Sequence, residues 1–404
     1  MLKKSDTLPL WLLILIVGFP VLSETVYTPA LPDIAHSLKV PDSWVEYTLT
    51  IYLMGFAVGT FLWGILSDTH GRKPYLLLGF LVYVLGTIGC YYSESIEMLL
   101  TARFIQAFGG STGSVLGQAI TRDSFQGSSL NKVYALVGSA IGIFPALGPV
   151  IGGVIDQSYG WHAIFLFLIG WGVLLWFSIL KFLPETHQKR TVAQKVPILH
   201  TMNRLLRDKR VLGFCFLVGA GNGIFFSYCA EGPFFLIEVL GLTPSAYGAT
   251  FFGLSGALVL GGFACRKLLD HYGPLKIIQL GLHIMLATQA LFCGVILASH
   301  SVVIAPSLLI ATTIITITIS GFGSIMVNSS SLSVALENYR DVTGTASSFL
   351  GLSYYIVISL FTLGMGLLHN GTLMPMPLYF LAITLAAWVV FKKVLWIPNR
   401  AQEK

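Results

Sequence analysis

The sequence predicts an all-α membrane protein in which twelve transmembrane helices form two six-helix bundles with pseudo-two-fold symmetry. Three observations predict this fold class. Hydrophobic residues make up 55% of the 404-residue chain and charged residues only 10%, whereas a soluble protein carries about 25% charged residues. Twelve apolar segments are long enough to cross a bilayer. A short motif from the first half of the chain also returns in the second half.

The apolar segments follow one another along the chain with mostly short polar connections. About 20 apolar residues span the hydrocarbon core, and such a segment must be helical because lipid offers its backbone no hydrogen-bond partners. In chain order, the expected helices cover residues 8–30, 44–66, 73–93, 98–120, 131–155, 162–183, 211–232, 246–266, 274–298, 302–327, 342–367 and 374–396.

The repeated motif predicts two related halves. The loop at 64–74 has a degraded copy at 266–274, and Asp68 is 202 residues from its counterpart Asp270, half of the chain length. The longest polar stretch separates the two copies. The expected division is an N-terminal bundle of residues 1–183, a cytoplasmic linker of residues 184–210 and a C-terminal bundle of residues 211–404.

Positive charges predict the orientation. Twelve spans place both termini on one side, and 22 of the 24 Lys and Arg residues lie on that side. The exceptions are Lys39, in an outer loop, and Arg103, inside a helix. Because Lys and Arg accumulate in cytoplasmic loops, we expect both termini in the cytoplasm. The net charge of +6 thus has a topological explanation and does not indicate nucleic-acid binding.

The sequence offers no site for an enzyme. Its loops are too short for a catalytic domain, the phosphate-binding motif GxxxxGKS/T does not occur, and the histidines are dispersed rather than clustered with Asp, Glu or Ser. The five cysteines lack metal-ligand spacing. We expect no enzymatic activity, cofactor or metal, and an ion gradient as the energy source of any pumping. A non-transporting membrane receptor is the alternative from a different class.

The first helix carries an acid, Glu24, about four turns after Leu8. Ionised carboxylates are costly in a membrane, so the protonated form is favoured and the group can carry a proton. Glu24 could instead meet a cationic substrate. A third possibility is that it lies near the outer headgroups, since the loop at 29–43 is only about a turn and a half away.

The loop at 64–74 predicts a cytoplasmic gate. Gly71 permits a tight reversal between two helices, and charges of both signs surround it. We expect this cluster to hold helix ends together in one state and to release them in another. The gate residues are Gly64, Asp68, Gly71, Arg72, Arg122 and Asp123.

The fourth helix contains Arg103, which cannot lose its proton and therefore needs a carboxylate, a carbonyl or water. Gln106 lies on the same face, three residues later. One interpretation is a fixed charge that tunes a nearby acid, which makes Glu24 and Arg103 the expected proton-coupling pair. The other is an Arg that extends to the outer headgroups near Glu94 and Glu97.

Glycines and prolines recur in the fifth helix. Small residues at four-residue spacing permit close helix contact, and prolines kink a helix. The pattern predicts a moving joint, and simple close packing is an interpretation compatible with it. The expected hinge residues are Gly142, Pro145, Gly148, Pro149, Gly152 and Gly153.

Polar residues in other helices are expected to line a substrate cavity. Glu231 is the most unusual of them, and a solvated outer loop is the alternative place for it. The candidate cavity residues are Tyr27, Gln106, Gln118, Asn222, Tyr228, Glu231 and Asn328.

These motifs resemble the major facilitator superfamily, and within it the twelve-helix drug:proton antiporters of the bicyclomycin/chloramphenicol-resistance type. The loop at 64–76 looks like the superfamily's G-x-L-x-D-x-x-G-R-K motif, and residues 103–106 resemble its R-x-x-Q motif. Residues 148–153 are similar to the antiporter motif G-P-x-x-G-G. Residues 27–32 and 119–123 are similar to sequences typical of the bicyclomycin-type branch.

The resemblance implies the major facilitator fold and a function. It implies a proton-coupled antiporter, monomeric and multi-pass in the bacterial plasma (inner) membrane, that exports small amphipathic drugs by alternating access. Its expected partners are a small-molecule substrate, protons and the lipid bilayer. The alternative is a proton-coupled exporter of an endogenous metabolite or siderophore.

The chain departs from this branch at several positions. The branch usually carries Asp where Thr25 stands, whereas the acid here is Glu24, and one position turns a helical side chain by about 100°. Glu231 is also unusual for the branch. These differences imply a substrate unlike the family's best-known drugs.

Overall fold

The computed structural model describes residues 8–125, 129–130, 132–133, 136–138, 142–186 and 198–396. The helices of the first half are α1 (Leu10–Thr25), η1 (Thr28–Ala30), α2 (Leu31–Leu38), α3 (Asp42–His70), α4 (Arg72–Tyr91), α5 (Ile96–Ser124), α7 (Phe144–Tyr159) and α8 (Trp161–Phe182). After α9 (Ile198–Arg207), those of the second half are α10 (Lys209–Pro233), η2 (Phe234–Val239), α11 (Pro244–Leu269), α12 (Pro274–Ala298), α13 (Pro306–Val334), η3 (Glu337–Val342), α14 (Thr343–Leu368), α15 (Pro375–Val390) and η4 (Phe391–Trp396).

Ten helices of the described residues are long and apolar enough to cross a membrane. The expected fourth and fifth spans complete the twelve. α5 is long, with 29 residues, but it is rich in Gly, Ser and Thr and is therefore less apolar. α7 has 16 residues, and parts of the expected helix 131–155 that precede it lie outside the described residues.

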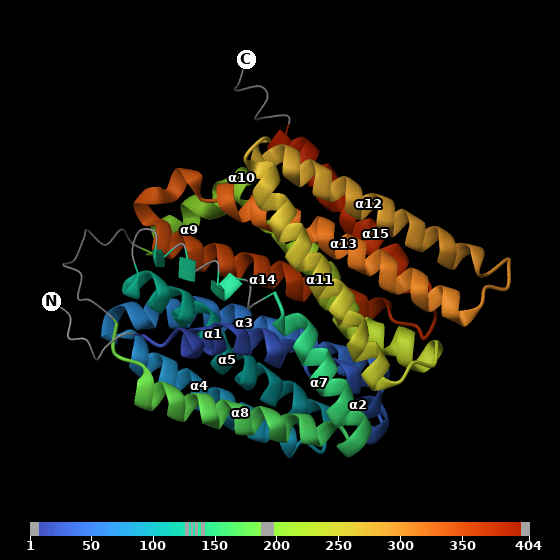
Figure 1. Cartoon of the computed structure of the whole chain (residues 1–404), viewed down its shortest axis with the longest axis horizontal. Helices are drawn as coiled ribbons and strands as arrows, with labels where there is room; N and C mark the ends of the chain where they lie inside the picture. Colours follow the sequence, from blue (N-terminus) through green and yellow to red (C-terminus); the bar gives the residue numbers. More distant parts are fainter. Residues whose placement is uncertain are drawn as a thin grey trace.

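The twelve helices form two bundles with matching internal contacts. Figure 1 shows the first bundle in blue to green beside the second in yellow to red. Within the first bundle α3 packs on α5 and α4 on α8, and the equivalent pairs α11–α13 and α12–α15 pack in the second. The bundles meet through the helix pairs α3–α14 and α7–α11. The pseudo-two-fold relation matches α3 with α11 and α14 with α7, so these two contacts are equivalent.

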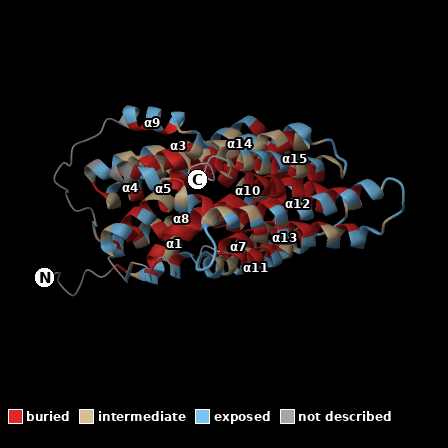
Figure 2. Cartoon of the chain, turned by 90° about the horizontal axis from the view of Figure 1, so that it is seen from above, coloured by how far each residue is buried: buried red, intermediate tan, exposed pale blue. Residues whose placement is uncertain are grey.

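Burial follows the expectation for lipid as the solvent. Figure 2 shows buried residues along the inside of the helices, with exposed residues facing outward. Large apolar side chains such as Phe177, Leu260 and Leu367 are more than half exposed. These side chains would be unfavourable in water, whereas hydrocarbon solvates them.

The first expected span, 8–30, is not one continuous α-helix. α1 ends at Thr25, and the short turn η1 precedes α2. Pro29 has no N–H to offer the Thr25 carbonyl, and the Thr28 hydroxyl donates to that carbonyl instead, at 2.9 Å. The break places Glu24 in the last turn of α1.

The expected linker, 184–210, contains helix α9, while residues 187–197 lie outside the described residues. α9 packs against α10 and α14. The guanidinium of Arg204 lies 4.6 Å from the ring centroid of Tyr339. This part of the linker is therefore attached to the second bundle.

Candidate functional site

A cavity of about 210 Å³ lies between the two bundles. Helices α1 and α7 of the first bundle and α10, α11, α13 and α14 of the second contribute to its wall. Its polar lining residues are Glu24, Asn222, Ser320, Ser324, Asn328 and Tyr355. The rest of the wall is mainly apolar, so the cavity combines an apolar surface with a few orienting polar groups.

Glu24 is the one acidic side chain among the described residues that line this cavity. The residue is 3% exposed, so the interpretation that outer headgroups solvate it is wrong. Within the described part of the chain, its Oε1 atom has no hydrogen-bond partner. A buried carboxyl of this kind is suited to bind and release a proton as the cavity changes its access to water.

Thr25, the residue after Glu24, faces helix α7. The Thr25 hydroxyl donates to the Val21 carbonyl at 3.0 Å. A Cβ atom placed on Gly148 of α7 would overlap the Thr25 hydroxyl, so the two residues are in close contact. An acid at position 24 therefore reaches the cavity, whereas position 25 belongs to the α1–α7 interface.

Arg103 lies deep inside the first bundle and is 0% exposed. Its guanidinium stacks between two aromatic rings, 3.8 Å from the centroid of Tyr27 and 4.1 Å from that of Tyr52. Its Nη1 atom donates to Gln106 Oε1 at 2.5 Å. The interpretation that Arg103 extends to the outer headgroups is therefore wrong, because aromatic faces and an amide replace water around the charge.

Hydrogen bonds connect Arg103 to the residue before Glu24. Gln106 Nε2 donates to the Tyr83 hydroxyl at 3.4 Å, and that hydroxyl lies 2.9 Å from Ser23 Oγ. Among the described residues, Arg103 and Glu24 form no ion pair, and Arg103 Nε and Nη2 have no hydrogen-bond partner. Arg103 is thus a fixed positive charge held behind α1.

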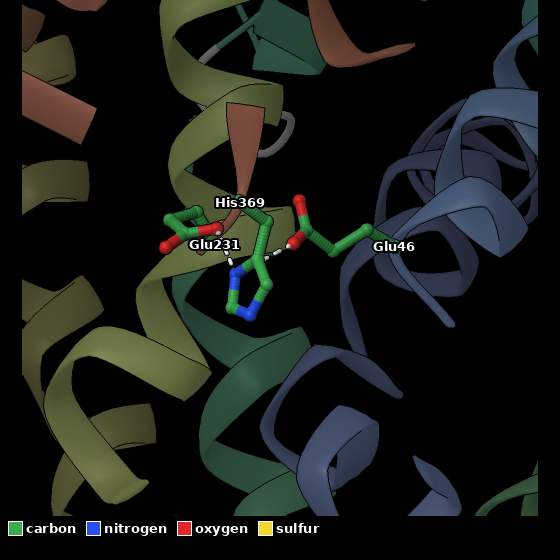
Figure 3. Close-up of side chains that lie close together, drawn as sticks. All are labelled: Glu46, Glu231 and His369. Atoms are coloured by element: carbon green, nitrogen blue, oxygen red, sulfur yellow. Dashed lines mark hydrogen bonds and ion pairs between the residues drawn. The ribbon is translucent and has the colours of Figure 1, made fainter. Parts of the chain in front are cut away.

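A second polar cluster lies at the end of the molecule that also holds His36, called the outer end below. Glu46 on α3, Glu231 on α10 and His369, which follows α14, meet there (Figure 3). His369 Nδ1 lies 2.9 Å from Glu231 Oε2 and 3.2 Å from Glu46 Oε1, and Nε2 lies 3.4 Å from Asp42 Oδ2. Burial alone would lower the pKa of His369, but the hydrogen bond and charge of Glu231, together with Asp42, raise it above its ordinary value.

This cluster corrects three expectations. Glu231 is 2% exposed, so a solvated outer loop is the wrong place for it, and it does not line the cavity. The expectation of no cluster of His with Asp or Glu is wrong here. His369 and Glu231 are 138 residues apart in the chain, and no local spacing signals their meeting.

The outer end joins the two bundles through further charges. His36 Nε2 of α2 lies 2.9 Å from Glu238 Oε1 of η2. With Asp42–His369 and Glu46–His369, the described residues form three ion pairs between the first and second bundles at the outer end. The bundles are therefore in contact at this end.

The predicted gate lies at the opposite, inner end. Arg72 pairs with Asp68 and donates from Nε to Asp123 Oδ2 at 3.0 Å. Gly71 has a positive φ of 108°, a conformation that favours glycine. Arg122 is exposed.

The partners of Arg72 place the gate charges within the first bundle. The N–H groups of Arg72 and Lys73 donate to the Glu185 carboxylate at 3.0 and 3.1 Å. Together with Asp68 and Asp123, these contacts connect α3, α4, α5 and the end of α8. Gly64 approaches the other bundle, since a Cβ atom on it would lie 3.1 Å from Ser348 Oγ of α14.

The glycine face of α7 touches both bundles. A Cβ atom on Gly152 would overlap the Val26 carbonyl after α1, and one on Gly153 would lie 2.8 Å from the carbonyl carbon of Pro244 in α11. Pro149 is inside the helix, whereas Pro145 is in its first turn and begins it. Gly142 precedes the helix.

The other cavity candidates divide into two groups. Asn222 and Asn328 line the cavity as expected. Tyr27 and Gln106 contact Arg103 instead. Tyr228 and Gln118 are not among the residues that line this cavity: Tyr228 packs against Tyr247 with ring centroids 6.2 Å apart, and Gln118 is exposed.

Sequence reasoning missed three polar cavity residues, Ser320, Ser324 and Tyr355. Ser and Tyr are common in membrane helices. Only the direction in which each side chain points distinguishes a cavity position from a packed one.

Comparison with known proteins gives one family. The model of the Major Facilitator Superfamily matches residues 13–362. An uncharacterized transporter of Rickettsia felis is 35% identical over 97% of this chain and 99% of its own length. The chloramphenicol resistance protein of Pseudomonas aeruginosa is 30% identical over 91% of this chain and 86% of its own. Multidrug resistance protein D of Escherichia coli is 29% identical over 55% of this chain and 56% of its own.

Two solved structures share the fold. The POT family transporter PepTSo matches with a TM-score of 0.76 at 12% identity, over 98% of both chains. A bacterial homologue of the human lysosomal transporter Spinster, in an inward-facing and occupied conformation, matches with a TM-score of 0.73 at 14% identity, over 96% of both chains.

Proposed function

The chain belongs to the Major Facilitator Superfamily and is a membrane transporter rather than an enzyme, and from this premise we propose that it is a proton-coupled antiporter. It exports small amphipathic compounds across the bacterial inner membrane and works as a monomer with cytoplasmic termini. The observation that carries the proposal is Glu24, a buried acid on the wall of a mainly apolar cavity between two bundles.

The cycle follows from the position of Glu24. When the cavity opens outward, Glu24 takes up a proton and the substrate leaves. When the cavity opens inward, Glu24 loses the proton and a new substrate enters. Arg103, held behind α1 between Tyr27 and Tyr52, is the fixed positive charge of the first bundle that accompanies this acid through the cycle.

The two ends of the molecule have different roles in this cycle. Three ion pairs join the bundles at the outer end, which supports a state closed on that side and a cavity that communicates inward. α7 touches both bundles and serves as the joint about which they rock. The Arg72 cluster holds the inner ends of α3, α4 and α5 together as a unit during the motion.

The names of the relatives support the substrate class. One is a chloramphenicol resistance protein and another a multidrug resistance protein. The cavity of this chain, with apolar walls and amide and hydroxyl groups, suits molecules of the same general chemistry.

The experiment is substrate-dependent proton flux in proteoliposomes. A pH-sensitive dye inside the vesicles reports protons while chloramphenicol and other amphipathic compounds are added. Wild type should show flux, whereas Glu24→Gln should lose it. Glu94→Gln is the control because this acid is exposed at the surface. Full coupling in Glu24→Gln would overturn the proposal.

A further inference from the structure

We propose that Glu46, Glu231 and His369 form a binding site for a divalent transition metal of the Zn²⁺ type at the outer end. The site takes one ligand from the first bundle and two from the second. A metal ion bound there ties the bundles together in the outward-closed state.

The three ligand atoms already have the spacing of a metal site. One carboxylate oxygen of each Glu and a ring nitrogen of His369 all lie within 4.8 Å of one another. The nitrogen is 2.9 Å from Glu231 Oε2 and 3.2 Å from Glu46 Oε1. Ligands about 2.0–2.2 Å from a tetrahedral Zn²⁺ are separated by roughly 3.3 Å, so only small side-chain shifts are needed.

The orientation of the His369 ring is the one that a metal ligand requires. Nδ1 faces the two Glu carboxylates, and Nε2 faces Asp42 Oδ2 at 3.4 Å. A histidine that binds a metal through one nitrogen commonly donates its other N–H to a carboxylate, which fixes the tautomer and the ring plane. Asp42 is therefore a positioning residue for His369.

The carboxylates of the site are buried, so they require a positive charge nearby. Glu46 is 0% exposed, and apart from its contacts with His369 and Glu231 its oxygens have no hydrogen-bond partner among the described residues. Glu231 is 2% exposed beside it. Two adjacent buried carboxylates are costly unless a cation compensates them. An imidazole nitrogen with few oxygens favours Zn²⁺ over Mg²⁺ or Ca²⁺, which prefer shells of six or more oxygens.

Ligands from both bundles make the binding state-dependent. Opening of the outer end separates Glu46 from Glu231 and His369, so the metal binds the closed state better and shifts the population toward it. The His369 side chain is 10% exposed and that of Asp42 31%, which gives the ion a path from the outer side. External Zn²⁺ is thus expected to slow transport.

The test is calorimetric titration of the full, detergent-purified chain with ZnCl₂ at constant pH, after removal of metals by a chelator and with Mg²⁺ in excess. We expect one Zn²⁺ per chain. Glu231→Gln and His369→Gln should weaken binding at least 100-fold. Asp42→Asn should weaken it roughly 10- to 100-fold, as is usual for the partner of a metal-bound histidine.

His36→Gln is the matched control, because His36 also pairs with a carboxylate between the bundles but has a 74% exposed side chain. It should bind Zn²⁺ within twofold of wild type. His369→Cys supplies another zinc ligand and should retain binding where His369→Gln does not, which separates lost ligation from misfolding.

Several outcomes would overturn the proposal: no Zn²⁺ uptake by wild type, unchanged uptake in His369→Gln, or an equal loss in His36→Gln. In each case the three residues do not form the proposed metal site. The titration needs no transport, so it stands even if the antiport proposal fails. In vesicles with proton flux, external Zn²⁺ should slow wild type and leave His369→Gln unaffected.

Discussion

Glu24 and Thr25 lie on different sides of α1: Glu24 lines the cavity between the bundles, whereas the Thr25 hydroxyl lies against Gly148 of α7. Adjacent helical residues point about 100° apart, so a shift of one position changes the environment of an acid completely. The close approach of α7 leaves no room at position 25 for a side chain to reach the cavity.

Exchanging the two residues should therefore abolish coupling. In the double variant Glu24→Thr/Thr25→Glu, the acid meets the closely packed α1–α7 interface instead of the cavity. We expect at least a tenfold loss of substrate-driven proton flux in proteoliposomes. Glu24→Asp keeps an acid at the cavity and should retain coupling at a lower rate. Wild-type flux in the exchanged protein would show that the side of α1 does not matter.

A methyl group on the α7 glycine face should destabilise the protein. In Gly152→Ala the new Cβ overlaps the backbone carbonyl of Val26, which cannot rotate away as a side chain can. Overpacking of this kind costs about 1–3 kcal/mol, so thermal unfolding in detergent should occur at a clearly lower temperature.

The control for this variant is Gly170→Ala. Apart from its chain neighbours and the backbone of its own helix, no described atom lies within 4 Å of a Cβ at Gly170, and alanine in a helix is favoured over glycine by roughly 0.5–1 kcal/mol. Gly170→Ala should unfold at the wild-type temperature or above it. Equal midpoints for the two variants would contradict the close α1–α7 packing.

Arg103→Lys should impair both stability and coupling although the charge is kept. An ammonium lacks the planar group that stacks between Tyr27 and Tyr52, and desolvated contacts of this type are worth about 2 kcal/mol. We expect a lower unfolding temperature and a large loss of proton flux. Arg266→Lys is the control because Arg266 is exposed; similar behaviour of the two variants would argue against the stacked arrangement.

The two acids that pair with Arg72 should differ in importance. The Asp123 side chain is 27% exposed and that of Asp68 63%, so solvent screens the second pair more strongly. We expect Asp123→Asn to lower the free energy of unfolding by about 1 kcal/mol and Asp68→Asn by roughly 0.3 kcal/mol. Denaturant unfolding of both variants checks the order, and a reversed order would refute the screening argument.

Much of the fold could be predicted because lipid narrows the choice of structure. A long apolar segment must satisfy its own backbone hydrogen bonds, so segment length alone predicts helices such as α4 and α12. The first span shows the limit of this reasoning. Its length predicts one helix, but Pro29 removes a donor and breaks the helix at Thr25.

Residues of the candidate site could be predicted only where a charged side chain is energetically costly inside the membrane. Glu24 and Arg103 stand out in sequence because charges inside membrane helices are rare. Ser320 and Tyr355 do not stand out, since the same residue types also occur on packed faces. Their role as cavity residues depends on helix rotation, which the packing of neighbouring helices decides.

By itself, the sequence determined the membrane class, the two related halves and the presence of isolated charges inside helices, because these follow from composition and spacing. Only the tertiary structure decided that Glu24 faces the cavity and Thr25 faces α7, and that Glu46, Glu231 and His369 meet between the bundles. The physical reason is that contacts between residues as far apart as Glu231 and His369 depend on how whole helices pack. A local pattern along the chain does not contain that information.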